Sequence, residues 1–276
     1  MTSLIGVCAA QWGTCAFFET LALGLQKMRL IINADDFGKD ENATTAIVKA
    51  FREGYVNQTT LMVNMPWADR AVEMAKGLGF ADKVGLHLNI TEGVPLTENM
   101  SACRVFCDEG GVFKCHIPTA DELKDATVCS ALTGEIKAQV QKYQEYDLSL
   151  MHCDGHHHVQ TRLHIARVLM PILRKYGFKS IRRPNNCYDN SYAFHLRSRL
   201  HQLAFTSLAR KYDLQLTTWF TGWKDLNFNR MRGHVLEIMV HPRYDDRHKL
   251  LDVQDFHNNT GRPMCDMISY VGERFA

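Results

Sequence analysis

From residue 28 onward, short apolar runs alternate with longer segments of helical periodicity. Strands that alternate with helices pair in parallel and are joined by right-handed crossovers. The expected strands are Met28–Asn33, Thr59–Asn64, Val84–Ile90, Leu148–Cys153, Phe178–Arg182, Leu214–Phe220 and Val235–His241. The expected helices are Asn42–Glu53, Trp67–Lys76, Ala120–Tyr146, Arg162–Tyr176 and Ser191–Tyr212. No linker or change in composition divides the series, which favours one barrel-like α/β domain over a two-domain arrangement.

Residues 1–27 precede this pattern and are expected to be an N-terminal extension, with the domain at 28–276. The extension is rich in apolar residues, but polar residues interrupt it and no Lys or Arg precedes the apolar stretch. It therefore fits neither a signal peptide nor a membrane span. A helix that associates with a membrane surface is the alternative, and stable membrane insertion is not expected.

The charge balance and the cysteines limit partners and compartment. The 32 Lys and Arg nearly match the 30 Asp and Glu, giving a formal charge of +2, so no electrostatic footprint for nucleic acid is present. The nine cysteines are odd in number and lack the spacing of a disulfide framework, which favours a reducing compartment. We expect a cytoplasmic protein.

Polar residues follow the first expected strand at the point where α/β barrels build their active sites. Asp35 and Asp36 come directly after the apolar run. Adjacent carboxylates on an extended chain point in different directions, so one can bind a cation while the other stays free as a base. A helix N-cap or a turn is the alternative, because Asp favours both.

Histidines occupy the ends of two further expected strands. His87 lies inside an apolar strand, and three consecutive histidines, His156 to His158, follow Asp154. With a period of two, Asp154, His156 and His158 would share one face. Asp36, His87 and His156 together supply one carboxylate and two imidazoles, which is a donor set for a divalent cation with positions left open. Taken singly, each histidine also fits a buried core role.

The last expected strand carries a glutamate and a histidine. Glu237 and His241 are four residues apart and so lie on the same face of a strand. His241 can act as a general acid, with Glu237 setting its orientation or its pKa. The alternative is a buried pair with a structural role alone.

Five motifs, in this order, resemble the YdjC/ChbG carbohydrate deacetylases: NADDFG, GLHLNIT, DGHHHVQ, IRRP and EIMVHP. The resemblance covers about residues 28–245. It implies a distorted β/α (TIM-like) barrel of the glycoside hydrolase/deacetylase type. It also implies a metal-dependent hydrolase that removes an N-acetyl group from an amino sugar, such as chitobiose or a short N-acetylglucosamine oligosaccharide, in chitin degradation.

The resemblance also assigns roles. Asp35 matches the catalytic base, and His241 matches the histidine near the leaving group. The implied metal ligands are Asp36, His87 and His156. Arg182 holds the base or the substrate, and Glu237 and His158 are expected to orient groups of the site. The implied cofactor is one divalent cation, Mg²⁺ or Zn²⁺, with Mn²⁺ and Co²⁺ also fitting.

Two other functions stay open at this point. A metal-dependent hydrolase of another bond, such as a phosphoester, uses the same ligands. A non-catalytic sugar-binding protein on the same fold is the third reading, since fold alone does not fix function. The expected partner is a small carbohydrate and not a nucleic acid, and a homodimer stays open as an assembly.

Overall fold

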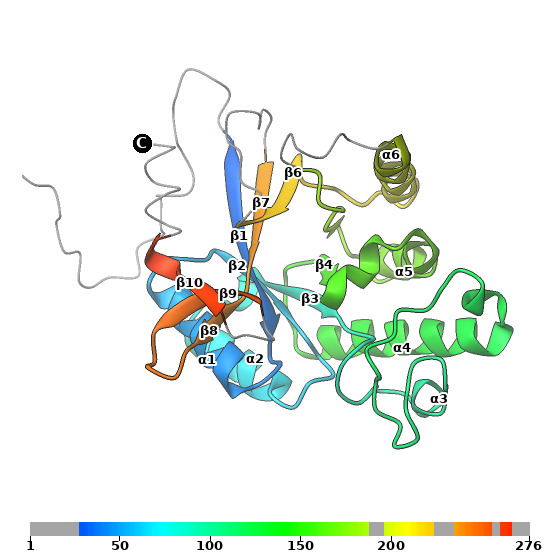
Figure 1. The fold of residues 1–276 in the computed structure, drawn as a ribbon, viewed down its shortest axis with the longest axis horizontal. Helices are drawn as coiled ribbons and strands as arrows, with labels where there is room; N and C mark the ends of the chain where they lie inside the picture. Colours follow the sequence, from blue (N-terminus) through cyan, green and yellow to red (C-terminus); the bar gives the residue numbers. More distant parts are fainter. Residues whose placement is uncertain (1–27, 188–195, 224–234, 256–259, 267–276) are drawn as a thin grey trace, which may run out of the picture.

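The computed structural model describes residues 28–187, 196–223, 235–255 and 260–266. At its centre is a parallel sheet curled into a half-barrel, with helices around it (Figure 1). Its strands are β1 (Arg29–Phe37), β2 (Gln58–Leu61), β3 (Val84–Leu88), β4 (His152–Gly155), β5 (Ser180–Ile181), β6 (Trp219–Gly222) and β7 (Val235–Val240). Among the described residues these form a seven-stranded sheet in the order β5-β4-β3-β2-β1-β7-β6. The predicted N-terminal extension, residues 1–27, lies outside the described residues.

The chain before β6 links the two edges of this sheet. Gln215 pairs in parallel with Ser180 of β5, and its backbone N–H donates to the Lys179 carbonyl at 2.8 Å. Trp219 of β6 pairs with Leu236 of β7 at the other edge. This short bridge brings the edges together, so the predicted distorted TIM-like α/β barrel is confirmed.

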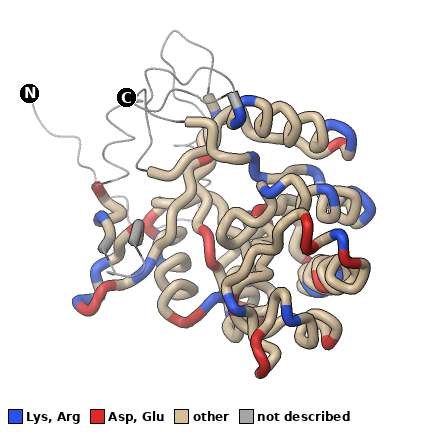
Figure 2. The backbone as a smooth tube through the Cα atoms, turned by 45° about the vertical axis from the view of Figure 1, so that its right-hand side comes forward, with Lys and Arg blue, Asp and Glu red and all other residues tan. Residues whose placement is uncertain are grey.

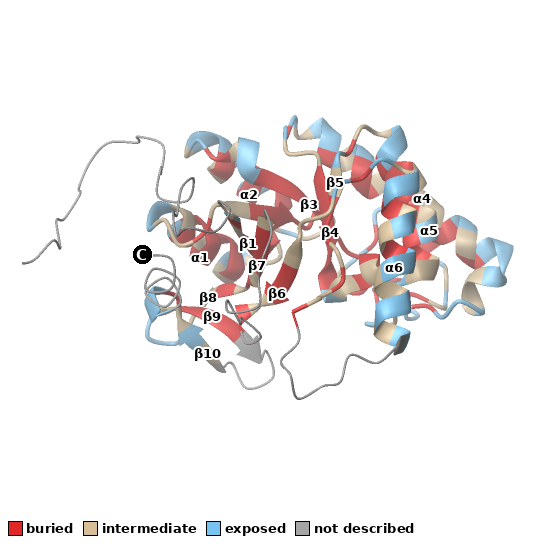
Figure 3. Ribbon diagram, turned by 90° about the horizontal axis from the view of Figure 1, so that it is seen from above, coloured by how far each residue is buried: buried red, intermediate tan, exposed pale blue. Residues whose placement is uncertain are grey.

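The helices cover the outside of the sheet, and buried residues follow the strands and the inner helix faces (Figure 3). The helices are α1 (Glu41–Arg52), α2 (Ala68–Gly77), α3 (Glu98–Ser101), α4 (Ala126–Glu145), α5 (Leu163–Lys175) and α6 (Leu196–Lys211). Short 3₁₀ turns are η2 (Ala81–Lys83), η3 (Glu122–Lys124) and η4 (His156–Thr161). In α1, Asp40 accepts the Ala43 N–H at 2.8 Å, the usual N-cap arrangement.

One helix prediction needs adjustment. The segment predicted as one helix from Ala120 to Tyr146 begins as the 3₁₀ turn η3, and α4 starts only after Asp125, whose carboxylate caps it. The helix predicted at Arg162–Tyr176 is present as α5, which contains Pro171. Part of the helix predicted at Ser191–Tyr212 lies outside the described residues, and α6 accounts for the rest.

An additional antiparallel sheet packs beside α1 and was not predicted. It comprises β8 (Pro242–Tyr244), β9 (Leu250–Asp255) and β10 (Thr260–Pro263), in the order β10-β9-β8. Asn42 of α1 exchanges two hydrogen bonds with the Tyr244 backbone, at 2.8 and 3.0 Å. Arg243 pairs with Asp40 at 2.6 Å. These contacts hold the segment that follows β7, which carries His241.

Lys and Arg are interspersed with Asp and Glu along the chain (Figure 2). Among the helices that the structure describes, none combines the length and apolar character needed to cross a membrane.

Candidate active site

Polar side chains from five strand ends meet at the carboxyl edge of the sheet. Parallel strands place their C-terminal ends together, where α/β barrels build their sites. The predicted residues brought together there are Asp35, Asp36, His87, His156, His158, Arg182, Glu237 and His241. Asp154 joins them from β4, and all except His158 and His241 are buried.

A bulge in β1 lets both adjacent aspartates reach this cluster. Between Ala34 and Phe37, β1 advances three residues while β2 advances only from Thr59 to Leu61. Asp36 takes up the extra residue with φ +70°, a conformation that Asp tolerates better than most residues. The two carboxylates diverge, as expected, toward Arg182 and toward His156 and His87, and the bulge sets the direction of each because a bulge re-aims side chains.

Arg182 is the centre of what we call the arginine cluster, formed with Asp35, Asp154 and Glu237. The guanidinium is fully buried. Its two terminal nitrogens donate hydrogen bonds to the two oxygens of Asp35, at 2.6 and 2.8 Å. It also reaches Asp154 at 2.7 Å and Glu237 at 2.6 Å. A planar fork of donors suits several carboxylates at once, so Arg182 ties β1, β4 and β7 to the end of β5.

Asp35 is held as a carboxylate by this cluster. Besides the guanidinium, Asn33 Nδ2 donates to Asp35 Oδ1 at 2.8 Å. Burial raises the pKa of Asp35, but the Arg182 guanidinium outweighs burial and holds the pKa well below its usual range, with smaller help from His87 and His241. Both Asp35 oxygens therefore have hydrogen bonds and a full positive charge beside them.

Asp36, His87 and His156 form a second group, which we call the imidazole cluster. Asp36 Oδ1 lies 2.9 Å from His156 Nδ1 and 3.4 Å from His87 Nε2. Both Asp36 oxygens are buried without a hydrogen bond. Burial raises the pKa of Asp36, but the imidazoles of His156 and His87 outweigh it and hold the pKa well below its usual range.

These distances fit a shared cation. Atoms bound at 2.0–2.1 Å to one ion lie about 2.9 Å apart in an octahedron and about 3.4 Å apart in a tetrahedron. The donor atoms of the three side chains lie within 4.8 Å of one another. A buried carboxylate without hydrogen bonds, facing two imidazole nitrogens, is the arrangement that a divalent ion completes. The residues present therefore fit the predicted metal.

Asp154 connects the two clusters through His87. Its Oδ1 lies 2.7 Å from His87 Nδ1, and its Oδ2 accepts from Thr60 Oγ1 at 3.0 Å. Burial lowers the pKa of His87, but Asp154 and Asp36 outweigh it and raise the pKa to about 10. A carboxylate on the outer nitrogen of a metal-binding histidine fixes the ring and its tautomer. Sequence reasoning noticed Asp154 but gave it no role.

The three consecutive histidines do not continue strand β4, so the prediction that Asp154, His156 and His158 share one strand face is wrong. Strand β4 ends at Gly155 and the chain turns into η4. His157 and His158 have φ values of +51° and +55°. This sharp turn sends successive side chains to different surroundings, because left-handed residues break the two-residue period of a strand.

His158 lies on the arginine-cluster side. Its ring packs edge-on against Phe220, with centroids 5.9 Å apart, and Phe220 also stacks under the Arg182 guanidinium at 4.8 Å. Burial, followed by the charge of Arg182, lowers the pKa of His158 to about 4. The imidazole is therefore neutral near pH 7, and its buried Nδ1 has no hydrogen-bond partner.

His241 is held by its backbone at the end of β7. Its N–H donates to the buried carboxylate of Asp252 at 2.8 Å, and its carbonyl accepts from Val253 N–H at 3.0 Å. Strand β9 thereby clamps both backbone groups of His241. The partner that the structure gives Glu237 is Arg182, and Glu237 Oε2 is buried without a hydrogen bond. Glu237 thus supports Asp35 through Arg182, and its predicted action on His241 stays a prediction.

Glu92 and Lys39 complete the surroundings and were missed at the sequence level. Glu92 Oε1 lies 3.0 Å from His156 Nε2, and its Oε2 pairs with Lys39 Nζ at 2.7 Å. Contact with His156 and Lys39 lowers the pKa of Glu92 to about 2. Glu92 follows β3 in a loop, where no periodicity predicts side-chain direction. The one sequence signal that pointed to Glu92 was its closeness along the chain to His87.

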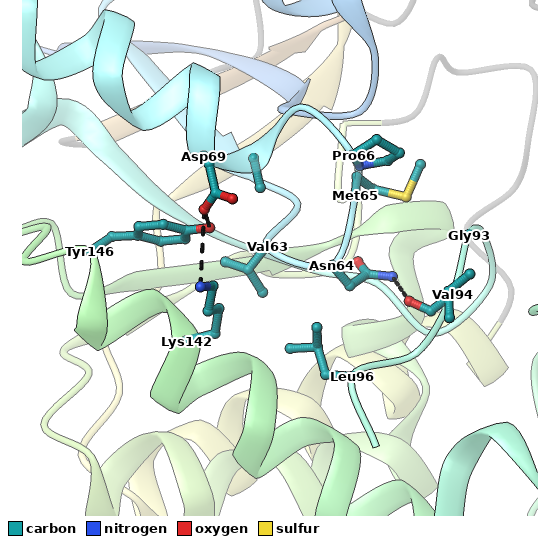
Figure 4. Close-up of a pocket in the computed structure, with 11 residues that line it drawn as sticks. Val63, Asn64, Met65, Pro66, Asp69, Gly93, Val94, Leu96, Lys142 and Tyr146 are labelled. Atoms are coloured by element: carbon teal, nitrogen blue, oxygen red, sulfur yellow. Dashed lines mark hydrogen bonds and ion pairs between the residues drawn. The ribbon is translucent and has the colours of Figure 1, made fainter. Parts of the chain in front are cut away.

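A separate cavity of about 310 Å³ lies beside the loop after β3. Its lining combines apolar residues such as Val63 and Leu96 with Asp69, Lys142 and Tyr146. Figure 4 shows Asp69 facing Tyr146 and Lys142 on one side and Asn64 facing Val94 on the other. It contains no member of the arginine or imidazole clusters, so the chemistry does not lie in this cavity.

Comparison with known proteins gives concordant matches. The family model described as YdjC-like protein matches residues 29–268. A carbohydrate deacetylase of Vibrio cholerae is 40% identical over 149 residues, which span 54% of this chain and 56% of the relative. The chain thus aligns with little more than half the length of that relative. A carbohydrate deacetylase of Brevibacillus brevis is 36% identical over 228 residues, covering 79% of this chain and 83% of the relative.

A solved structure shares the fold. It is an Enterococcus faecalis protein described as a cellobiose-phosphate cleavage protein, with a TM-score of 0.62 and 21% identity. The match covers 89% of this chain and 94% of that one. At this identity the likeness concerns the fold alone.

Proposed function

The chain belongs to the YdjC-like protein family, and from this premise we propose that it is a metal-dependent carbohydrate deacetylase. The reaction is hydrolysis of an N-acetyl group on an amino sugar. One observation carries the proposal: two adjacent buried aspartates lie in neighbouring clusters, Asp35 against a guanidinium and Asp36 against two imidazoles. One carboxylate is thereby assigned to proton transfer and the other to a cation.

We propose chitobiose or a short N-acetylglucosamine oligosaccharide as substrate, with a role in cytoplasmic chitin degradation. The names of the relatives, carbohydrate deacetylase, support the sugar class. We propose that the catalytic domain spans residues 28–276, with 1–27 upstream of it.

Asp36, His87 and His156 would hold the divalent cation, and the mixed carboxylate and imidazole donors suit Zn²⁺ while also accepting Mg²⁺, Mn²⁺ or Co²⁺. When bound there, the cation supplies polarisation of the acetyl carbonyl and acidification of a water molecule. Asp154 fixes the orientation of the His87 ring, so that the other ring nitrogen faces Asp36.

Asp35 accepts the proton of the attacking water. Arg182 keeps this carboxylate ionised at neutral pH and fixes its plane through two hydrogen bonds. The oxygen of the water then bonds to the acetyl carbon. Positioning of this kind supplies much of a hydrolytic rate enhancement.

His241 donates a proton to the departing amine as the carbon–nitrogen bond breaks. Its backbone is hydrogen-bonded to β9, which fixes the position of its Cα atom near Asp35. His158, neutral and with a buried ring nitrogen that has no partner, offers a hydrogen-bonding group to the sugar. The products are acetate and a free amino sugar.

The test is acetate release from N-acetylglucosamine oligomers, starting with the dimer. Metal-loaded protein is compared with an EDTA-treated sample and with the Asp35→Asn variant. We expect acetate from the loaded protein alone. Phosphate release from sugar phosphates without acetate would indicate a phosphoester hydrolase, and oligomer binding without any product would indicate a sugar-binding protein.

A further inference from the structure

We propose that Glu92 is a positioning residue that holds the His156 imidazole in its metal-binding orientation. The inference rests on the proposed function, because it concerns a residue outside the three predicted ligands of the same cation. It gives Glu92, a charged loop residue outside every sequence motif, a role in the site.

The first support is a repeated arrangement of imidazole and carboxylate. His87 turns one ring nitrogen to Asp36 at 3.4 Å and the other to Asp154 at 2.7 Å. His156 does the same, with one ring nitrogen 2.9 Å from Asp36 and the other 3.0 Å from Glu92. Each imidazole is thus placed between Asp36 and an outer carboxylate. Such outer carboxylates fix ring orientation and raise the basicity of a metal-binding histidine.

The second support is that Glu92 is itself held in place. Lys39 Nζ lies 2.7 Å from Glu92 Oε2, which leaves Oε1 directed at His156. The backbone is fixed as well: Asn89 Oδ1 accepts the Glu92 N–H at 3.1 Å, and Asn89 Nδ2 donates to the Glu92 carbonyl at 2.7 Å. A flexible loop side chain would lose entropy on orienting a ligand, and these contacts remove that cost in advance.

A buried pair on α4 anchors this loop to the scaffold. Gln139 bonds both backbone groups of Asn89, accepting at 3.0 Å and donating at 2.6 Å. Gln139 in turn donates to Glu135, whose carboxylate accepts the N–H groups of Leu96 and Thr97. Hydrogen bonds therefore run without a break from α4 through Asn89 to Glu92, and they anchor the loop that carries the outer carboxylate to a rigid element.

A second cation between Glu92, His156 and His157 is the competing interpretation of the same residues. Glu92 Oε1 lies 3.6 Å from His157 Nε2, and the three side chains could share an ion. Glu92 Oε2 is already paired with Lys39 Nζ at 2.7 Å, however, which leaves only Oε1 for a second ion. The His157 ring nitrogen Nδ1 is also 3.0 Å from Thr91 Oγ1. We therefore favour the positioning role.

The experiment is calorimetric titration of the metal-free full chain with Zn²⁺, and in parallel with Mn²⁺. We expect Glu92→Leu to raise the dissociation constant about 10–100-fold, the usual loss of affinity when an outer partner of a metal ligand is removed. Glu92→Gln keeps an acceptor but no charge and should fall between the two. Glu98→Gln, at an exposed glutamate that begins helix α3 six residues later, is the matched control and should bind as the wild type does.

Two further readouts separate positioning from damage to the fold. In EDTA, Glu92→Leu should melt within a few degrees of the wild type. Its activity should be lost at limiting Zn²⁺ and recovered at excess Zn²⁺, because affinity rather than the chemical step is affected.

The outcomes of the titration separate failure of this inference from failure of the proposed function. An unchanged dissociation constant in Glu92→Leu overturns the inference alone. A fall in stoichiometry from two ions to one also overturns it, in favour of the second cation. Failure of the wild type to bind any cation overturns the proposed function together with the inference.

Discussion

Asp35 and Asp36 are adjacent in the sequence, yet their carboxylates have opposite surroundings. In the arginine cluster, both oxygens of Asp35 accept hydrogen bonds from Arg182, and Asn33 adds another. In the imidazole cluster, neither oxygen of Asp36 accepts a hydrogen bond, although both are buried. The chain therefore holds Asp35 with a guanidinium in direct contact. Asp36 instead faces two imidazoles that can share a cation from outside, with the Lys39 ammonium 3.7 Å from its Oδ2.

This difference shows how one strand end can serve two chemical purposes. An aspartate bonded to a permanent cation stays ionised and keeps one geometry, although the same cation lowers its pKa and so makes it a weaker base. A buried aspartate without hydrogen bonds is costly on its own, and binding of a cation offsets that cost. The bulge in β1 makes the arrangement possible, because it brings both side chains to one site.

The largest effect is expected from removing the cation of the arginine cluster. Arg182→Met leaves the carboxylates of Asp35, Asp154 and Glu237 buried together. Breaking a buried charge network by removing one partner typically costs about 3–5 kcal/mol, so urea unfolding in EDTA should show a loss of that size, together with loss of activity. Arg70→Met, at an exposed position, is the control and should change little.

If Arg182→Met does not fold, Arg182→Lys gives the same test in a milder form. Lysine keeps the charge but not the planar fork, so activity should fall while the protein still folds. Wild-type stability and activity in both variants would contradict the role of the arginine cluster.

Removal of the proposed base should affect catalysis more than stability. Asp35→Asn keeps the shape of the side chain but cannot accept the proton, and kcat should fall about 10²–10⁴-fold, the usual contribution of general base catalysis. Steady-state acetate release measures this, with the exposed Asp82→Asn as the control. A kcat within twofold of the wild type would remove Asp35 as base.

Loading the imidazole cluster should stabilise the fold by a smaller amount. A ligand that binds the native state alone adds about 2.7 kcal/mol at a concentration 100 times its dissociation constant. Thermal melts of the EDTA-treated protein with added Zn²⁺ should show this gain in the wild type and lose it in His87→Ala. An equal gain in His87→Ala would place the cation elsewhere.

The smallest effect is expected at Glu237, which tests whether every carboxylate of the arginine cluster matters equally. Glu237 Oε1 accepts from Arg182 Nε, while Oε2 has no hydrogen bond. Glu237→Gln keeps the acceptor and removes a buried charge, so stability should change by about 1 kcal/mol or less. Acetate release should stay within tenfold of the wild type, and a loss as large as that of Asp35→Asn would contradict this ranking.

Much of the fold could be predicted from sequence periodicity. The alternation of apolar runs and helical segments placed the parallel strands close to their observed positions, and it indicated a barrel because no linker interrupts it. The bridge between Gln215 and Ser180 and the antiparallel sheet β8–β10 were not predictable in the same way. Both depend on pairings between segments distant in sequence, and short irregular strands leave no period to detect.

For the site, residue type predicted more than side-chain direction. The aspartate pair and the histidines were selected because such residues are costly in apolar strand ends without partners. Their grouping in the structure follows from the parallel sheet. The bulge at Asp36 and the turn at His157 could not be predicted, since both depend on backbone conformations set by neighbouring elements. Glu92 was missed because its loop is ordered by side-chain hydrogen bonds from α4.

The most direct test of the contrast between the two aspartates is an equilibrium metal titration of three proteins side by side. The wild type, Asp35→Asn and Asp36→Asn are each stripped of metal and titrated with Zn²⁺. We predict one tightly bound ion for the wild type and for Asp35→Asn, and none at the same concentrations for Asp36→Asn. Wild-type binding by Asp36→Asn, or loss of binding in Asp35→Asn, would contradict the division of tasks between the two carboxylates.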